Sequence, residues 1–197
     1  MISAEKLQLY FKIFRGLSLV DLQSIYHLVQ KRQLAVGEIF IQTDSLQRKM
    51  AYIRKGLIRA YTINEKGDEI TMMLRWEDQF VASPDAIIRD QPSRYQYEAL
   101  EPTELLQIDY DGLQEVLKKN PSYEQVRRHF LLKMLGESLD KVESFILLNP
   151  EERYLEFINK KTDIVNRVPD KYIAHILGIT PVSLSRIRRR IAGRSIN

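Results

Sequence analysis

The chain has 197 residues, of which 44% are hydrophobic, and its 30 Lys and Arg against 26 Asp and Glu give a formal net charge of +4. It contains no cysteine, which excludes disulfides, cysteine-ligated iron–sulfur clusters and thiolate nucleophiles. No apolar run approaches the roughly 20 residues that a membrane-spanning helix needs, and the N-terminus lacks a secretory pattern. We therefore expect a cytoplasmic protein with no membrane contact, large enough for one substantial domain and one small one.

Two short helices are predicted at the front of the chain. Ser3 and Ser18 are the expected N-caps, and Ser18 with Asp21 resembles a capping box. The expected buried face of the second helix consists of Leu22, Ile25, Tyr26 and Val29.

From about residue 33 to residue 108 the sequence changes to short runs of β-branched and aromatic residues separated by glycines. Such runs predict an antiparallel β domain. The clearest hairpin turn is Asn-Glu-Lys-Gly at 64–67, which should join strands over 57–63 and 68–75. Asp109 should then cap a helix that runs to about Lys118.

A long helix with two apolar stripes is predicted after Pro121. The residues of the first stripe recur at spacings of three and four, as in the seam of a two-stranded coiled coil. They are Leu132, Leu135, Leu139, Val142 and Ile146. We expect this stripe to form a homodimer interface, whereas the alternative is packing on the β domain of the same chain. The second stripe, formed by Phe130, Met134 and Phe145, should meet that β domain.

The segment 169–191 has the spacing of a helix-turn-helix. Ile173 and Leu177 share one helical face, and Gly178 should end the first helix in a left-handed conformation. Thr180 and Pro181 should begin the second helix, as N-cap and first residue. The side of that helix expected to point inward is formed by Leu184, Ile187 and Ile191.

The other side of this second helix carries hydroxyl and guanidinium groups, which can bind base edges and phosphates in the major groove of DNA. With one lysine of the first helix, the candidate DNA-binding residues are Lys171, Thr180, Ser183, Ser185, Arg186, Arg189 and Arg190. Arg186 is expected to read a base, and the lysine and the last two arginines to hold phosphates. His175 is expected on the solvent side of the first helix. The alternative is an arginine-rich helix end that is merely solvated.

Positive charge is concentrated in the same region. Residues 151–197 hold 10 Lys and Arg against 5 Asp and Glu, whereas the first 150 residues hold 20 against 21. Localised positive charge favours binding of a polyanion, because condensed counterions are released. The sequence therefore predicts double-stranded DNA as the partner of the last quarter of the chain.

The order of these elements resembles the Crp/Fnr family of bacterial transcription regulators. Within the helix-turn-helix, the residues in register with the family are Ala174, Gly178, Leu184 and Arg186. The resemblance implies an α+β fold: an antiparallel β-roll of the cyclic-nucleotide-binding type with flanking helices, a long dimerisation helix and a C-terminal helix-turn-helix domain. It divides the chain into a sensor domain (1–120), the dimerisation helix (121–149) and the DNA-binding domain (150–197). RNA polymerase and a small-molecule effector are the further partners it implies.

The chain also departs from the family pattern. Pro181 and Val182 replace an arginine and a glutamate common in the family's recognition helix, so the operator should differ, and the few residues after Ile191 predict a truncated β-wing. In the roll, Ser83 and Ser93 stand where nucleotide-binding members have a glutamate and an arginine, so we expect no ordinary response to cyclic AMP. The candidate residues for a different effector pocket are Ser83, Arg89, Ser93 and Arg94.

Other function classes lack their residue patterns. The three histidines, His27, His129 and His175, are far apart and none lies in the β domain, so we expect no bound metal or haem. No phosphate-binding glycine loop, exposed-serine elbow or zinc spacing is present, so we expect no enzyme. The alternative to a regulator is a signalling module that binds a nucleotide or a partner protein and contacts DNA only weakly and without specificity.

Overall fold

The computed structural model describes residues 18–118, 123–160 and 163–194. Its helices are α2 (Leu19–Leu28), α3 (Pro84–Ile88), α4 (Tyr110–Leu117), α5 (Tyr123–Leu147), α6 (Pro150–Lys160), α7 (Ile164–Arg167), α8 (Asp170–Leu177) and α9 (Pro181–Arg194). Its strands are β1 (Gln30–Leu34), β2 (Ile39–Ile41), β3 (Lys49–Lys55), β4 (Ile58–Ile63), β5 (Glu69–Arg75), β6 (Phe80–Ala82), β7 (Gln96–Ala99) and β8 (Thr103–Asp109). Within these residues, no helix is both long enough and apolar enough to span a bilayer.

The strands form a β-roll of two four-stranded sheets, in the orders β1-β8-β3-β6 and β2-β7-β4-β5, and every pairing is antiparallel. Phe40, Ile53 and Leu105 are among the buried side chains that fill the space between the sheets. The predicted hairpin at 64–67 is confirmed: the Asn64 side chain accepts backbone hydrogen bonds from Lys66 and Asp68. The antiparallel β domain predicted from the sequence is therefore present.

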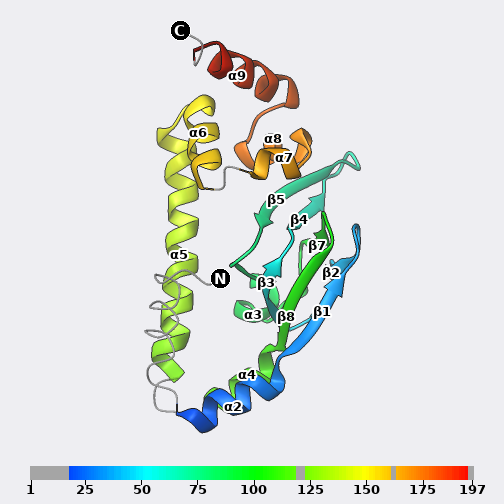
Figure 1. Cartoon of the computed structure of the whole chain (residues 1–197), viewed down its shortest axis with the longest axis vertical. Helices are drawn as coiled ribbons and strands as arrows, with labels where there is room; N and C mark the ends of the chain where they lie inside the picture. Colours follow the sequence, from blue (N-terminus) through cyan, green and yellow to red (C-terminus); the bar gives the residue numbers. More distant parts are fainter. Residues whose placement is uncertain (1–17, 119–122, 161–162, 195–197) are drawn as a thin grey trace.

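Helices α2 and α4 lie at one end of the roll (Figure 1). The capping box of Ser18 and Asp21 is confirmed, and Asp109 caps α4 through a 2.8 Å bond from the Gly112 amide. The expected buried face of α2 is wrong, because Tyr26 is 75% exposed and none of the residues of this helix is fully buried. Among the described elements, α2 packs mainly on α4, along one side. The helix expected after Ser3 lies outside the described residues.

Helix α5 stands beside the roll along its length (Figure 1). Its first stripe is open in the single chain, with exposed fractions of 53–74% for Leu132, Leu135, Leu139, Val142 and Ile146. In the second stripe, the ring of Phe130 meets Phe80 of the roll edge to face, at 5.5 Å between centroids. Phe145 differs from the expectation, since it packs against Gly178 of the helix-turn-helix. One side of α5 therefore packs within the chain, and the other side is exposed.

The four C-terminal helices pack on the roll rather than standing apart from it. Asn149 caps α6 by accepting hydrogen bonds from the amides of Glu151 and Glu152. Leu57 and Leu74 of the roll belong to the same hydrophobic cluster as the cores of α6, α7, α8 and α9. In Figure 1, α7 and α8 lie over the ends of β4 and β5, and α9 is the outermost element.

Candidate nucleic-acid interface

Local sequence signals build the helix-turn-helix of α8 and α9 as expected. Gly178 has φ +66° at the end of α8, and Ala174, fully buried, lies between the two helices. A Cβ atom at position 178 would come within 2.6 Å of the Phe145 ring, so glycine is required by contact as well as by conformation. The Thr180 hydroxyl accepts a 3.1 Å hydrogen bond from the Ser183 amide, which makes it the N-cap of α9.

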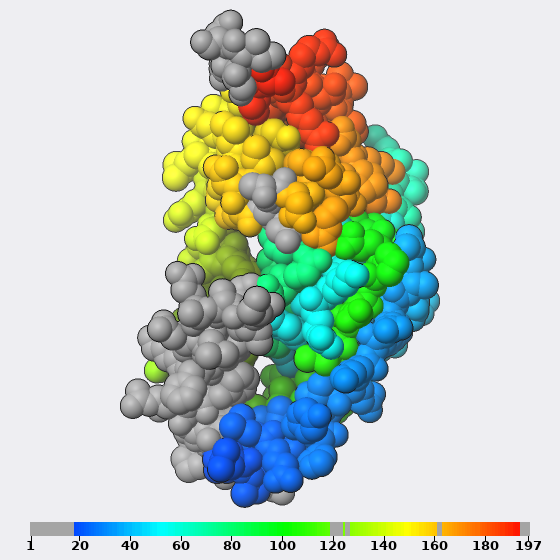
Figure 2. Space-filling view, viewed as in Figure 1, coloured from blue at the N-terminus to red at the C-terminus, as the bar shows by residue number. Residues whose placement is uncertain are grey.

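Helix α9 has an inward apolar face and an outward polar face. Leu184 and Ile187 are buried in the cluster shared with the roll. The side chain of Arg188 points towards α6 and α8, where it donates to Asp170 at 2.6 Å and to the hydroxyl of Tyr154 at 3.2 Å. The helix lies at one end of the molecule (Figure 2), and the residues on its side opposite the cluster are exposed.

Three candidate residues on that outward face are free within the described residues. Ser185, Arg186 and Arg189 are exposed, and neither arginine is ion-paired with any residue between 18 and 194 that the structure describes. Lys171 is also exposed, on α8. Free guanidinium groups on a solvent-facing helix are able to make two parallel hydrogen bonds to guanine or to bind phosphate oxygens.

The remaining candidates are already engaged. Arg190 forms a 2.8 Å ion pair with Glu151, at the start of α6. The hydroxyls of Thr180 and Ser183 lie 3.0 Å apart, and the first of them is used by the helix cap. A groove runs between α9 and the start of α6, and Ser183, Arg186 and Arg190 line it together with Glu151. The negative charge of Glu151 would repel a DNA phosphate that approaches Arg190.

His175 does not lie on the solvent side of α8, so that expectation is wrong. Its Nδ1 atom accepts a 3.2 Å hydrogen bond from the backbone amide of Thr71. Strand β5 is the edge of its sheet, so an amide on its outer side needs an acceptor from elsewhere. Burial lowers the pKa of His175, and the positive charges of Lys171 and Arg59 lower it further.

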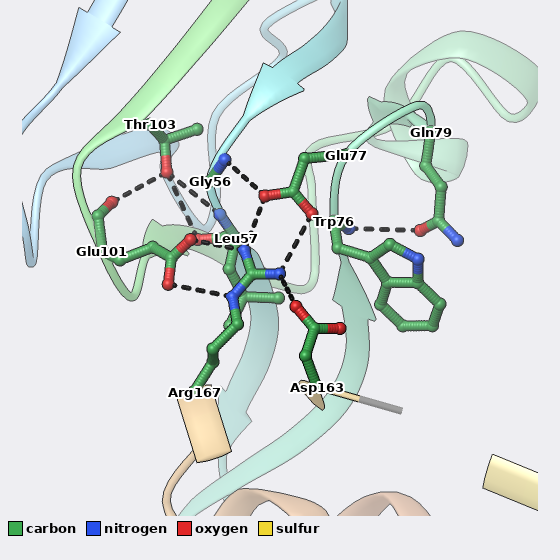
Figure 3. Close-up of polar contacts among 9 residues, drawn as sticks. All are labelled: Gly56, Leu57, Trp76, Glu77, Gln79, Glu101, Thr103, Asp163 and Arg167. Atoms are coloured by element: carbon green, nitrogen blue, oxygen red, sulfur yellow. Dashed lines mark hydrogen bonds and ion pairs between the residues drawn. The ribbon is translucent and has the colours of Figure 1, made fainter. Parts of the chain in front are cut away.

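Arg167 links α7 to the roll in a contact that sequence reasoning missed. Figure 3 shows its guanidinium between Glu77, Glu101 and Asp163, which it reaches at 3.2 Å or less. Burial alone would raise the pKa of Glu77, but hydrogen bonds from Arg167 and from the Gly56 amide lower it to about 2. Glu77 and Arg167 are 90 residues apart, so no local pattern could have indicated the pair.

Arg59 makes a second link between the roll and the helix-turn-helix. Its side chain is almost fully buried in β4, where it pairs with Glu69 at 2.8 Å and also with Glu98. The guanidinium carbon lies 3.9 Å from the ring centroid of Tyr61 and 4.2 Å from that of Tyr172, which belongs to α8. Helix α8 therefore packs on the sheet at β4 and β5. The contact is made by the stacking of Tyr172 on Arg59, whose charge is balanced by glutamates of the sheet.

The four candidate effector residues do not surround a common open pocket. Ser83 is buried as the N-cap of α3, and Ser93 is buried with its hydroxyl bonded to the Tyr95 carbonyl at 2.7 Å. Arg89 and Arg94 both bind the carboxylate of Asp85. The positive charges of Arg89 and Arg94 are thus already paired with a carboxylate of the chain itself.

A separate cavity of about 240 Å³ lies between the roll and α5, and of those four residues only Ser83 borders it. Its walls are mainly apolar, with Met50, Met73, Phe80, Ile87, Phe130 and Met134 among them. The ion pair of Arg75 with Glu137, at 2.8 Å, borders the same space. Within the described residues no cluster of three His, Asp or Glu side chains could hold a metal ion.

Comparison with known proteins gives the following relatives. Residues 31–120 match a family model for the cyclic nucleotide-binding domain. The chain is 31% identical over 175 residues to the fumarate and nitrate reduction regulatory protein of Vibrio cholerae, across 82% of this chain and 68% of that protein. A protein of the same name from Yersinia pestis is 26% identical over 191 residues, across 89% of this chain and 74% of its own length.

Solved structures share the fold at lower identity. FixK2 from Bradyrhizobium japonicum is similar with a TM-score of 0.71 and 16% identity, over 85% of this chain and 86% of that one. The catabolite activator protein of Thermus thermophilus is similar with a TM-score of 0.54 and 16% identity, over 93% of this chain and 87% of that one.

Proposed function

This chain belongs to the Crp/Fnr family of transcriptional regulators, and we propose that it binds an operator in double-stranded DNA as a homodimer through the outward face of α9. The observation that carries this proposal is the solvent-facing side of α9, on which Ser185, Arg186 and Arg189 are exposed while Leu184 and Ile187 anchor the helix. A helix presented in this way fits the major groove. Such a regulator acts where bacterial DNA is, in the cytoplasm.

The candidate residues divide by their surroundings. Arg186 would read a base, because it lies on the outward face without a carboxylate partner among the described residues. Arg189 and Lys171 would bind phosphates, with Ser185 assisting. Arg190 would contribute less, since Glu151 already neutralises it. Thr180 and Ser183 would act chiefly by fixing the start of the helix.

The dimer would form through the open stripe of α5. Its five apolar side chains, all at least half exposed, follow the spacing that two helices need to pack side by side. Contact with water on so many aligned apolar side chains is unfavourable, and burial in a second copy removes it. Two recognition helices would then address two half-sites about one helical turn apart.

The division of labour along the chain follows from this arrangement. Residues 1–120, which include the roll, would act as the sensor domain, α5 within 121–149 as the dimer helix, and 150–197 as the DNA-binding domain. An effector would bind in the apolar cavity between the roll and α5. Binding there would move α5 and thereby change the spacing of the two recognition helices in the dimer. RNA polymerase would be the partner on the promoter.

Selection of bound fragments from random duplexes tests this function. We expect an inverted repeat, bound with an affinity that falls steeply as salt rises. Salt-dependent binding without sequence preference, or no binding at all, would instead support the signalling module. A chain with Arg186→Ala serves as the matched control, since it should select a repeat that has lost one specified position in each half.

A further inference from the structure

The outermost line of α9 contains one apolar side chain. Val182, the second residue of the helix, is 61% exposed and takes no part in the cluster beneath. At about 100° per residue, Val182, Arg186 and Arg189 fall within an arc of about 60°, opposite Leu184 and Ile187. The valine therefore stands on the same outward line as the free arginines.

No contact among the described residues explains a valine at this position. It is exposed, so the described residues gain little from its packing, and valine is a weaker helix former than alanine, glutamate or lysine. Its neighbours on the outward face are polar or charged. Its place in the first turn of α9 matters, because the N-terminal residues of a recognition helix lie nearest to the base edges.

The chemistry of valine restricts what it can recognise. Its side chain neither donates nor accepts a hydrogen bond, so facing the polar edge of a purine or of cytosine would leave a base group unpaired. Thymine is the base that presents a methyl group in the major groove. On the basis of the DNA binding proposed above, we propose that Val182 selects a thymine in each half-site by packing against its 5-methyl group.

The position of this thymine follows from the helix. Val182 and Arg186 are four residues apart, about 6 Å along the axis, which corresponds to about two base-pair steps of DNA. The thymine should thus lie within about two base pairs of the base that Arg186 reads. Because a guanidinium prefers guanine, each half-site should combine a guanine and a nearby thymine.

Replacement of thymine by deoxyuridine tests this contact, because it removes only the 5-methyl group. The selected operator is prepared with a single substitution at each thymine in turn, and affinity is measured for the full chain and for Val182→Ala. For the unmodified chain, one thymine per half-site should lose about fourfold in affinity on substitution, and about fifteenfold when both half-sites are changed. In Val182→Ala the same substitution should have no effect.

Two further variants serve as controls. Val182→Ile keeps an apolar contact and should retain the sensitivity to the methyl group, whereas Arg189→Ala should weaken binding without altering that sensitivity. If the chain binds its operator selectively but every thymine tolerates deoxyuridine, or if Val182→Ala remains sensitive at the same thymine, the role of Val182 is wrong while the DNA-binding function stands. If no operator is selected, both fail.

Discussion

The Nδ1 atom of His175 accepts a hydrogen bond of 3.2 Å from the backbone amide of Thr71, which joins the first helix of the helix-turn-helix to the edge strand of the roll. Only a neutral imidazole can accept at Nδ1, and burial lowers the pKa of His175 below the ordinary 6.5. The contribution of this bond to docking is therefore complete above pH 6.5. This contribution decreases as the pH falls below 6.5. It is lost once the pH has passed the lowered pKa of His175 in the folded state, because the imidazole is then protonated.

We expect this loss to depend on one side chain. In His175→Asn, an amide oxygen can replace Nδ1 as acceptor but does not titrate, so docking should become insensitive to pH in this range. Trp76, the single tryptophan of the chain, packs against the shared cluster and reports docking by its fluorescence. His27→Asn, on exposed α2, is the control and should behave like the unmodified chain. Equal pH curves for His175→Asn and the unmodified chain would refute the expectation.

Removal of Arg167 should loosen the same docking by a different route. Arg167→Ala leaves Glu77 and Glu101 half-buried without their cation, and we expect a loss of about 1–3 kcal/mol in the free energy of unfolding. Arg127→Ala, which breaks an exposed pair with Glu124, should cost less than about 0.5 kcal/mol. Urea unfolding measures both. Equal losses in the two variants would mean that the Arg167 network adds nothing to stability.

The network also predicts behaviour in acid. The pKa of Glu77 is about 2 in the folded chain against an ordinary 4.5, so its contribution is full above pH 4.5 and is lost as the pH falls towards 2. Glu77→Gln should remove this part of the acid sensitivity. The free energy of unfolding, measured by urea from pH 5 to pH 2.5, should then fall less steeply than in the unmodified chain. An unchanged slope would contradict the assignment.

Two glycine substitutions should have opposite effects. Gly178→Ala places a Cβ at φ +66° and within 2.6 Å of the Phe145 ring, so we expect a loss of about 1–3 kcal/mol in stability. Gly136 lies in α5 with open space around it, so Gly136→Ala should gain about 0.5–1 kcal/mol. Thermal unfolding followed by circular dichroism compares them. A stable Gly178→Ala variant would show that the turn is not as the structure has it.

A charge in the open stripe of α5 should dissociate the dimer. Leu139→Glu sets like charges against each other across the seam, and we expect monomers in sedimentation velocity at concentrations where the unmodified chain is dimeric. Val36→Glu, at an exposed site in the turn between β1 and β2, is the matched control and should leave the mass unchanged. A dimer that survives Leu139→Glu would place the interface elsewhere.

Much of the DNA-facing motif could be predicted from sequence because its signals are local. The left-handed Gly178, the cap by Thr180 and the inward Leu184 and Ile187 each depend on residues within one or two helical turns. Strand periodicity and the turn at Asn64 likewise indicated the antiparallel roll. These features are set by backbone conformation and by the side on which apolar residues fall.

The sequence by itself thus determined which helix faces outward and which fold carries it. Only the tertiary structure decided which charged groups remain free for a partner: Arg190 is taken by Glu151, Arg167 by Glu77, and His175 by an amide of β5. Each of these partners is between 39 and 104 residues away in the chain. The physical reason is that an ion pair or a hydrogen bond requires atoms within about 3 Å, and a sequence pattern fixes such distances only along one helix or hairpin.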